Sequence, residues 1–261
     1  MTAHYEEWKV APELDALVAC VWAARFADSG EPHVERVIPD GCIDLIYTEG
    51  ALIVAGPDTH GVALHPAARA EFAGLRFRPG VAPALLGVPA SELVDQRVDA
   101  DCLLGASARR ILEQLEAAGS RRARAAVLEA HVQSWMRHAG ASAPDRLARA
   151  AAQRLKTAPH DRSVASLANE LGVSERKLHR RFVHALGYGP KMFARIARLQ
   201  RFLAYAAHPP SAAPTAIGRR PGLAELALAA GYADQPHLTR ECRALAGVTP
   251  SALIGYPVTA G

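Results

Sequence analysis

The histidines in the first quarter of the chain are the side chains best suited to bind a metal. His33, Glu35, His60 and His65 offer imidazole and carboxylate groups, which zinc and iron sites use as ligands. No H-x-H pair places two imidazoles on one face of a strand. His60 and His65 belong to a segment that contains Pro and Gly, where surface histidines are common. We therefore expect neither a metal nor another cofactor.

Cys42 offers a second chemistry, that of an alkyl-accepting thiol beside an Asp-Gly turn. No His, Arg or Lys adjoins it in sequence to lower its pKa. The cysteines form no C-x-x-C pair, so neither a zinc site nor a disulfide framework is indicated. They are Cys20, Cys42, Cys102 and Cys242. Unreactive buried thiols are the expected state, and no catalytic residue is predicted.

The segment from Ser163 to Phe193 carries a dense cluster of basic side chains. Apolar residues at i, i+3, i+4 and i+7 from Val164 predict a helix that Ser163 caps. Gly172 ends this helix, and Ser174 caps a second helix almost at once. The polar face of the second helix holds Glu175, Arg176, Lys177, His179, Arg180, Arg181 and His184. Two helices that cross steeply, one with a basic outer face, predict a helix-turn-helix.

The same unit occurs a second time between Gly222 and Leu253. Leu223, Leu226, Ala227 and Ala230 repeat the spacing of Val164, Leu167, Ala168 and Leu171, and Gly231 takes the place of Gly172. With one extra residue in the turn, Leu238, Arg240, Cys242, Gly247, Pro250 and Leu253 match Leu178, Arg180, Phe182, Gly187, Pro190 and Phe193. Two repeats are too few for a solenoid. They indicate paired units that bind double-stranded DNA.

The second copy resembles the signature of the AraC/XylS transcriptional regulators. The resemblance rests on Ala229-Ala230-Gly231-Tyr232, Asp234-Gln235 and Gly247-Val248-Thr249-Pro250-Ser251. It covers about Asp145 to Ile254. It implies two helix-turn-helix units in one domain, joined by a long helix.

The resemblance also implies which side chains meet DNA. Base contacts carry over to Arg176, His179, Arg180, Gln235, Thr239 and Arg240. Contacts to phosphate are expected from Ser174, Lys177, Arg181, Lys191 and Asp234. Pro236 departs from the polar residue common in the family, and its ring, which has no donor, can only pack.

Charge divides the chain into an acidic and a basic part. The formal net charge of the whole chain is +4. Residues 1–106 hold 7 Arg and Lys against 16 Asp and Glu, whereas residues 107–261 hold 23 against 10. Basic charge confined to one part of a chain is typical of proteins that bind a polyanion. Together with the repeat, this division favours DNA as the partner.

Length and composition allow two domains. The chain has 261 residues, of which 50% are hydrophobic, so it can bury a sizeable core. No apolar run approaches the roughly 20 residues of a membrane span. The first ten residues lack the basic start and apolar core of a signal peptide. We expect a cytoplasmic protein without a membrane partner.

Short apolar runs between Val18 and Phe77 predict strands rather than helices. Their number and spacing favour a small β-barrel or sandwich. The segments Val37–Ile46, Ala55–Asp58 and Gly74–Gly80 resemble the cupin-like sensor domain found ahead of AraC-type domains. The resemblance implies a barrel that binds an effector or serves assembly. Trp22, Tyr47, Arg76 and Phe77 are the candidates for lining an effector pocket, because aromatic walls with a polar anchor suit ligands.

The chain turns helical after Pro79. Amphipathic patterns over Ser107–Ala118 and Arg121–His138 predict a helical hairpin. The hairpin is expected either to pack against the barrel or to form the seam of a homodimer. Ala139–Pro144 is the predicted domain boundary.

The predicted class is therefore α+β with two domains. Residues 1–140 form a β-barrel sensor or assembly domain ending in the hairpin, and residues 143–261 form an all-α DNA-binding domain. Its helix-turn-helix units span about 163–187 and 222–247, and a helix over 191–207 joins them. The segment His208–Gly222 exceeds the family length and holds four prolines. It predicts a surface loop, from which Arg219 and Arg220 can reach a phosphate.

These observations predict a sequence-specific transcription regulator that responds to a ligand. RNA polymerase and a small-molecule effector are expected as further partners, and the regulator can act as an activator or as a repressor. An enzyme is not expected. The alternative is an alkyl-acceptor or cupin-type enzyme domain that the C-terminal half positions on DNA.

Overall fold

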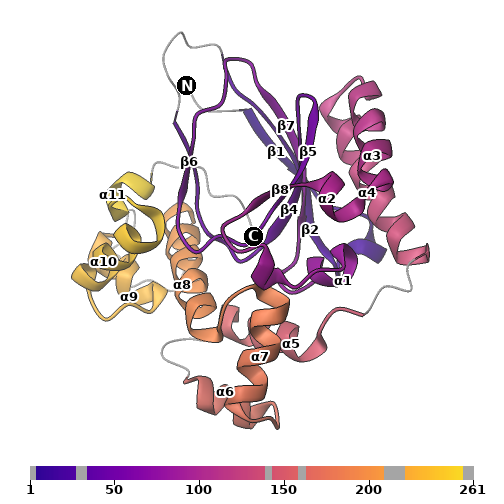
Figure 1. Ribbon diagram of the computed structural model, residues 1–261. Helices are drawn as coiled ribbons and strands as arrows, with labels where there is room; N and C mark the ends of the chain where they lie inside the picture. The colour runs from indigo at the N-terminus through magenta and orange to yellow at the C-terminus, as the bar shows by residue number, and fades with distance from the viewer. Residues whose placement is uncertain (1–3, 28–33, 139–142, 158–162, 209–220, 255–261) are drawn as a thin grey trace.

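The computed structural model describes residues 4–27, 34–138, 143–157, 163–208 and 221–254. Most of the predicted boundary at Ala139–Pro144 lies outside these ranges, as do Arg219, Arg220 and most of the predicted loop at His208–Gly222. His33 also lies outside them. Within the described part, the expected α+β class is confirmed, with strands gathered in the N-terminal half and helices in the C-terminal half (Figure 1).

Six antiparallel strands form the main sheet of the N-terminal half. In spatial order they are β1 (His4–Trp8), β2 (Val18–Arg25), β7 (Glu71–Phe77), β4 (Ile43–Thr48), β5 (Ala51–Ala55) and β8 (Arg97–Asp99). Two further strands, β3 (Glu35–Val37) and β6 (Val62–Leu64), pair with each other as a separate ribbon. The short helical elements are η1 (Pro12–Leu14), α1 (Ala82–Leu86), η2 (Ala90–Glu92) and α2 (Ala100–Leu104).

The strands of the described residues do not close into the barrel that the sequence predicts. The main sheet begins at β1 and ends at β8, and hydrogen bonds join neither edge to the β3–β6 ribbon. A ring of strands needs a continuous ladder around its circumference. The N-terminal half is instead an open sheet with a detached ribbon.

The main sheet has two faces because side chains alternate along each strand. One face carries the large core residues Leu45, Tyr47, Leu75 and Phe77, all 4% exposed or less. The opposite face carries a separate cluster of Cys20, Trp22, Ala24 and Phe26. Neighbouring residues of one strand thus belong to different clusters.

A helical hairpin covers the first of these faces. It consists of α3 (Ala106–Ala117) and α4 (Arg121–His138), close to the predicted ranges. Ile111, Leu115, Leu128 and Val132 are fully buried in the same cluster as the sheet core. Figure 1 shows both helices on one side of the sheet. The hairpin therefore packs on the sheet, as the first of its two predicted arrangements requires.

The C-terminal half contains seven helices within the described residues. They are α5 (Arg146–Thr157), α6 (Val164–Glu170), α7 (Glu175–Leu186), α8 (Pro190–Ala207), α9 (Leu223–Ala230), α10 (Gln235–Ala246) and α11 (Pro250–Leu253). The pairs α6–α7 and α9–α10 are the two helix-turn-helix units. Gly187 and Gly247 both end the second helix of their unit with a positive φ, of 92° and 72°. The repeat in sequence is thus a repeat in structure.

The long helix α8 belongs to both units. Phe193 and Ile196 in its first half are buried in the core of the first unit. Leu199 and Phe202 in its second half are buried in the core of the second. One rigid helix therefore fixes the position of each unit relative to the other. None of the helices in the described part of the chain combines the length and apolar character that crossing a membrane requires.

Candidate nucleic-acid interface and the cavity behind it

Helix α7 presents the predicted base-reading residues of the first unit to solvent. Leu178 and Phe182 are fully buried, and this fixes which side of the helix faces out. Arg176, His179 and Arg180 are exposed on the other side.

Two expected phosphate contacts, Ser174 and Lys177, meet at the start of α7. Ser174 caps the helix, with its hydroxyl accepting a hydrogen bond from the Lys177 amide at 3.3 Å. Both side chains are exposed, as is Lys191 in the first turn of α8. Exposed amides at a helix N-terminus, with lysines beside them, suit a phosphate.

Two side chains of α7 already have neighbours within the protein. Arg181 donates to Asp145 with Nε and Oδ2 2.6 Å apart. Burial raises the pKa of Asp145, but the Arg181 hydrogen bond and backbone amides lower it more, so the net shift is downward. The carboxylate therefore holds Arg181 as an ion pair. The ring of His179 lies against Gly189, where an added Cβ would come within 2.8 Å of Nε2.

Helix α10 presents the corresponding residues of the second unit. Asp234 caps the helix by accepting from the His237 amide at 2.6 Å. Gln235, Pro236 and Arg240 are exposed. Thr239 is half-buried, and its hydroxyl donates back to the Gln235 carbonyl at 2.9 Å, which leaves its oxygen able to accept. The two units thus show equivalent outer faces.

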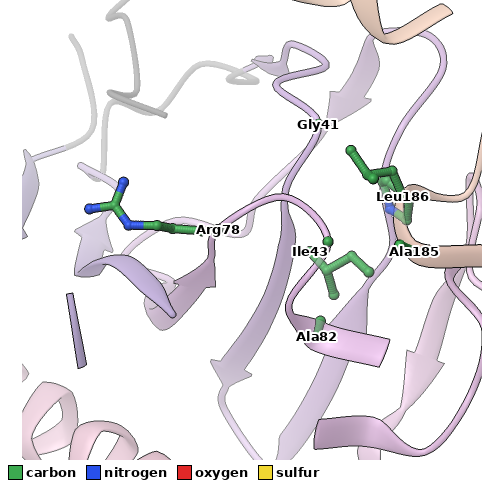
Figure 2. A pocket seen from close by; sticks show the side chains of 8 residues that line it. Gly41, Ile43, Arg78, Ala82, Ala185 and Leu186 are labelled. Atoms are coloured by element: carbon green, nitrogen blue, oxygen red, sulfur yellow. The ribbon is translucent and has the colours of Figure 1, made fainter. Parts of the chain in front are cut away.

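The inner ends of both units rest on the N-terminal half. Ala185 and Leu186 of α7 line one niche with Gly41, Ile43 and Ala82 (Figure 2). The next residue along the chain, Gly187, packs so closely that an added Cβ would be 2.6 Å from Val94 and 2.9 Å from Pro57. The end of the first unit is therefore fitted to the N-terminal surface.

The β3–β6 ribbon makes the matching contact with the second unit. Arg36 of β3 donates to the Ala246 carbonyl at the end of α10, over 3.1 Å. Gly61, next to β6, approaches the backbone of Ala246 so closely that a Cβ would lie 3.0 Å from its Cα. The ribbon is thus fixed against the C-terminal end of α10.

Between the ribbon and the sheet strands, residues 38–41 contact both units and α8. Ile38 packs against the core of the second unit. The carbonyl of Pro39 accepts from Gln200 of α8 at 2.7 Å. Gly41 has φ +83° and lies where an added Cβ would come within 2.7 Å of Phe193 in the first unit. We call these four residues the 38–41 segment.

A cavity of about 370 Å³ lies behind this segment. The second face of the main sheet, the β3–β6 ribbon and α8 supply its walls. The apolar part of the lining includes Tyr5, Trp22, Ala24, Phe26, Ile46, Ile53, Leu64, Phe72 and Leu203. The polar part includes Glu35, Arg36, Asp40, Asp44, Asp58, His65, Arg76, Arg97 and Gln200. The size and the mixture of walls are those of a small-molecule site.

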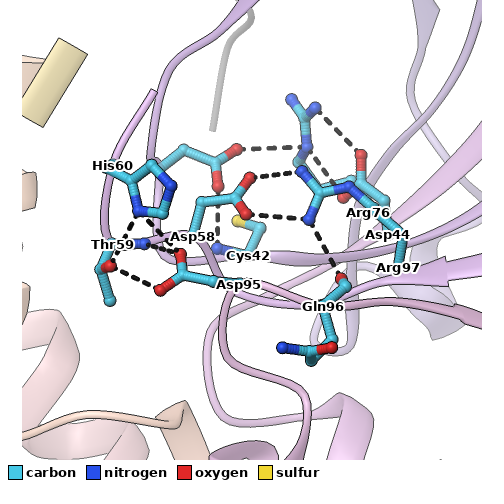
Figure 3. Close-up of polar contacts among 10 residues, drawn as sticks. Cys42, Asp44, Asp58, Thr59, His60, Arg76, Asp95, Gln96 and Arg97 are labelled. Atoms are coloured by element: carbon cyan, nitrogen blue, oxygen red, sulfur yellow. Dashed lines mark hydrogen bonds and ion pairs between the residues drawn. The ribbon is translucent and has the colours of Figure 1, made fainter. Parts of the chain in front are cut away.

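A network of ion pairs forms the polar end of the cavity (Figure 3). Arg76 donates to both oxygens of Asp44 at 3.1 Å, and its Nε lies 3.3 Å from Asp40 Oδ2. Arg97 donates to both oxygens of Asp58 at 2.8 and 2.7 Å. Burial raises the pKa values of Asp44 and Asp58 despite these partners. The carboxylates are therefore poorly solvated.

The four candidates for a pocket lining divide between the two faces of the sheet. Trp22 and Arg76 face the cavity, and the Trp22 indole donates to Asp44 at 3.1 Å. Tyr47 and Phe77 point the opposite way, into the core beneath the helical hairpin. The prediction is corrected for these two, because side chains one residue apart on a strand project to opposite faces.

Two family models match separate parts of the chain. Residues 167–255 match the model described as a helix-turn-helix domain. The C-terminal part of the chain is therefore an AraC-type helix-turn-helix domain. The chain is thus a DNA-binding transcription regulator. Residues 6–99, which hold most of the cavity lining, match a domain of unknown function, DUF6597.

Solved structures of ToxT from Vibrio cholerae show a weak overall similarity to this chain. ToxT of strain O395 is 7% identical, with a TM-score of 0.47 over 90% of this chain and 96% of that one. ToxT of strain SCE256 with a bound unsaturated fatty acid is 8% identical, with a TM-score of 0.45 over 100% and 97%. No curated protein matches the chain.

The sequence did not single out the acidic side of the cavity. Asp40, Asp44 and Asp58 come from three separate segments, and only the pairing of β4 with β7 sets Asp44 opposite Arg76. The sequence did contain one indication of this site. An Asp within an apolar strand segment is costly to bury unless it is paired, so it indicates a buried partner. Ile43-Asp44-Leu45 is such a case.

Among the described residues, those considered for metal or thiol chemistry do not form such a site. His60 lies 3.4 Å from Asp95, and in the described part of the chain no three His, Cys, Asp or Glu side chains gather to hold a metal. Burial raises the pKa of the Cys42 thiol well above its ordinary value, and Asp40 adds to the shift. A thiol kept protonated is a poor nucleophile.

Proposed function

We propose that this regulator reads DNA with both helix-turn-helix units and changes its affinity when a small effector fills the cavity. The observation that carries the proposal is the position of the 38–41 segment. Asp40 lines the cavity, while Ile38, Pro39 and Gly41 contact the second unit, α8 and the first unit. A ligand that favours one position of this segment changes the relative populations of DNA-binding arrangements.

Base readout is assigned to the exposed outer faces of α7 and α10. These residues are Arg176, His179, Arg180, Gln235, Thr239 and Arg240. Arginine and glutamine form paired hydrogen bonds to guanine and adenine edges in the major groove. The capping residues Ser174 and Asp234 place helix N-termini, and Lys177 and Lys191 place ammonium groups, where phosphates pass. Arg181 is ion-paired with Asp145 and therefore contributes less to phosphate binding.

The remaining partners follow from the regulatory role. The protein acts in the cytoplasm as an activator that contacts RNA polymerase. The outward side of the α3–α4 hairpin is proposed as a homodimer seam, with Met136, which is 43% exposed, at its edge. Sedimentation of the full chain tests the seam, and a Met136→Glu variant that stays dimeric would contradict it.

The N-terminal half is proposed to bind rather than to catalyse. An alkyl-acceptor role for Cys42 requires a thiolate, which its burial disfavours. Mass spectrometry of the protein after exposure to an alkylating agent is expected to find Cys42 unmodified and the exposed Cys102 modified. Preferential alkylation of Cys42 would support the alternative.

A binding experiment with a blocked cavity tests the regulatory proposal. Promoter DNA recovered with the protein from cells serves as the probe, and the small-molecule fraction of those cells supplies the effector. The wild-type protein is expected to change its DNA affinity when this fraction is added. Ala55→Phe fills the cavity and should bind DNA without responding, whereas Glu49→Phe in the exposed turn between β4 and β5 should behave as wild type. Equal responses from both variants would place the effector elsewhere.

A further inference from the structure

Carboxylates outnumber guanidinium groups in the cavity lining. Glu35, Asp40, Asp44 and Asp58 face Arg36, Arg76 and Arg97. Glu7 adds a further carboxylate 3.9 Å from Arg76. The surrounding residues 1–106 are also acidic, with 16 Asp and Glu against 7 Arg and Lys. The field inside the cavity is therefore negative, and low-dielectric walls strengthen it.

Two of the three guanidinium groups are paired with carboxylates. Arg76 and Arg97 make paired hydrogen bonds with Asp44 and Asp58. Arg36 donates through Nη1 to the carbonyl of Ala246, and its buried Nε has no hydrogen-bond partner among the described residues. An anionic ligand at Arg76 or Arg97 would have to break a pair and leave a buried carboxylate unpaired, which is costly.

Asp40 shares its guanidinium partner with a second carboxylate. Its Oδ2 lies 3.3 Å from the Nε of Arg76, which already donates to Asp44 at 3.1 Å. Its Oδ1 accepts from the Cys42 amide at 2.8 Å. One guanidinium nitrogen is thus shared by two carboxylates. The Asp40 side chain is 13% exposed, so a ligand in the cavity can reach it.

Aromatic rings line the same cavity as this carboxylate. Tyr5 and Trp22 form one pair with centroids 5.9 Å apart. Phe26 and Phe72 form a second, edge-to-face pair at 5.7 Å. Aromatic faces attract ammonium groups, and the attraction grows when the cation is removed from water. A cavity that holds a carboxylate and aromatic walls suits a positive head group on an apolar body.

We propose that the cavity binds an organic cation, an amine or quaternary ammonium compound with an apolar body, and that Asp40 anchors its charge. This inference rests on the proposed function, because it names the chemical class of the effector. The apolar body lies among Trp22, Ile46, Ile53 and Phe72. The positive head group pairs with the carboxylate of Asp40, which belongs to the 38–41 segment.

Calorimetry with three matched probes tests the charge preference on the full chain. Phenylbutylamine, phenylbutanol and phenylbutanoate share one body and differ in head group. The amine should bind at least about tenfold more tightly than the alcohol, and the carboxylate should bind most weakly. Equal or tighter binding of phenylbutanoate overturns the inference. Failure of both phenylbutylamine and benzyltrimethylammonium to bind at millimolar concentration also overturns it.

Two variants with a matched control locate the site. Asp40→Asn keeps an oxygen for the Cys42 amide but removes the charge, so it should weaken the amine about tenfold and leave the alcohol unchanged. Phe72→Leu keeps an apolar wall without a ring, and should weaken the amine by a smaller factor. Glu49→Gln removes an exposed carboxylate outside the cavity and should change nothing. Equal loss in Asp40→Asn and Glu49→Gln would show that only net charge matters and overturn the assignment.

DNA binding, measured on the same samples, separates this inference from the proposed function. If the protein binds its promoter and responds to phenylbutanoate rather than to the amine, the proposed regulatory function holds and the proposal of a cationic effector is wrong. If the protein binds no promoter DNA at all, the proposed function fails whatever the probes do.

Discussion

Arg180 and Arg240 hold equivalent places in the two reading helices, and both are exposed. A guanidinium there can donate two parallel hydrogen bonds to one guanine, a pairing worth about 1 to 3 kcal/mol against the wrong base. Arg180→Ala or Arg240→Ala should therefore lower affinity for the promoter by roughly ten- to a hundredfold and relax the preference at one base step. Binding to a series of single-base promoter variants measures both effects.

The matched control for these variants is Arg25→Ala. Arg25 is an exposed arginine of the N-terminal half that pairs with Glu71. Its loss changes net charge equally, and Arg25 lies far along the chain from both reading helices. If the ranking of promoter variants stays the same in Arg180→Ala and Arg240→Ala, these arginines contact only phosphate.

Gly74 shows how a single missing side chain shapes the cavity. A Cβ at Gly74 would lie 2.3 Å from two atoms of the Trp22 indole. Gly74→Ala should displace the indole from Asp44 and destabilise the fold by roughly 1–3 kcal/mol. Thermal denaturation measures the loss. Gly119→Ala, where a Cβ would meet nothing within 4 Å, is the control and should leave the melting temperature nearly unchanged.

At the scale of single residues, the sequence predicted the reading helices better than the cavity. Exposure of Arg176 and Arg180 follows from helical spacing relative to Leu178, a local property. Pocket residues depend on which strand face meets the ribbon, and this is decided by contacts distant in sequence. Tyr47 was therefore assigned to the wrong face, and Asp40 was not recognised.

Among the elements, helices with a clear apolar period and a terminal glycine were predictable, whereas short strands were not. The pattern from Val164 and the glycines after each helix located α6, α7, α9 and α10 closely. By contrast, β6 and β8 have three residues each, too few to show an alternation. The open sheet also could not be foreseen, because closure depends on how edge strands pair.

The β3–β6 ribbon connects the cavity with α10 through Arg36, whose Nη1 donates to the Ala246 carbonyl at 3.1 Å. Arg36→Met keeps most of the aliphatic stem but removes this donor. The last turn of α10 should then open more often, and its amides should exchange with solvent roughly tenfold faster. Hydrogen exchange of peptides covering residues 240–248 measures the change.

Arg243→Met provides the control for this experiment. Arg243 lies in the same turn of α10 and is exposed. Its replacement should leave the exchange rates of that turn as they are in the wild-type protein. Equal acceleration in both variants would mean that the ribbon does not stabilise α10.

Across the whole molecule, the hydrophobic clusters of the C-terminal half include residues from before the predicted boundary near residue 140. Val94 of the N-terminal half packs into the core of the first helix-turn-helix unit. Ile38 packs into the core of the second. Because residues of the N-terminal half pack against the cores of both units, the two halves should lose stability together, which favours a single cooperative transition over separate melting of two domains.

This cooperativity can be measured without added labels. All three tryptophans, Trp8, Trp22 and Trp135, belong to the first 140 residues, so their fluorescence reports the N-terminal half. Far-ultraviolet circular dichroism reports mainly helices, most of which lie beyond residue 140. The two thermal transitions should coincide in the wild-type protein. Ile38→Ala weakens the shared core and should separate them, with the helical signal lost first. Transitions that already differ by several degrees in the wild-type protein would mean that the halves fold independently, and an effector could then act on DNA binding only by shifting their contact.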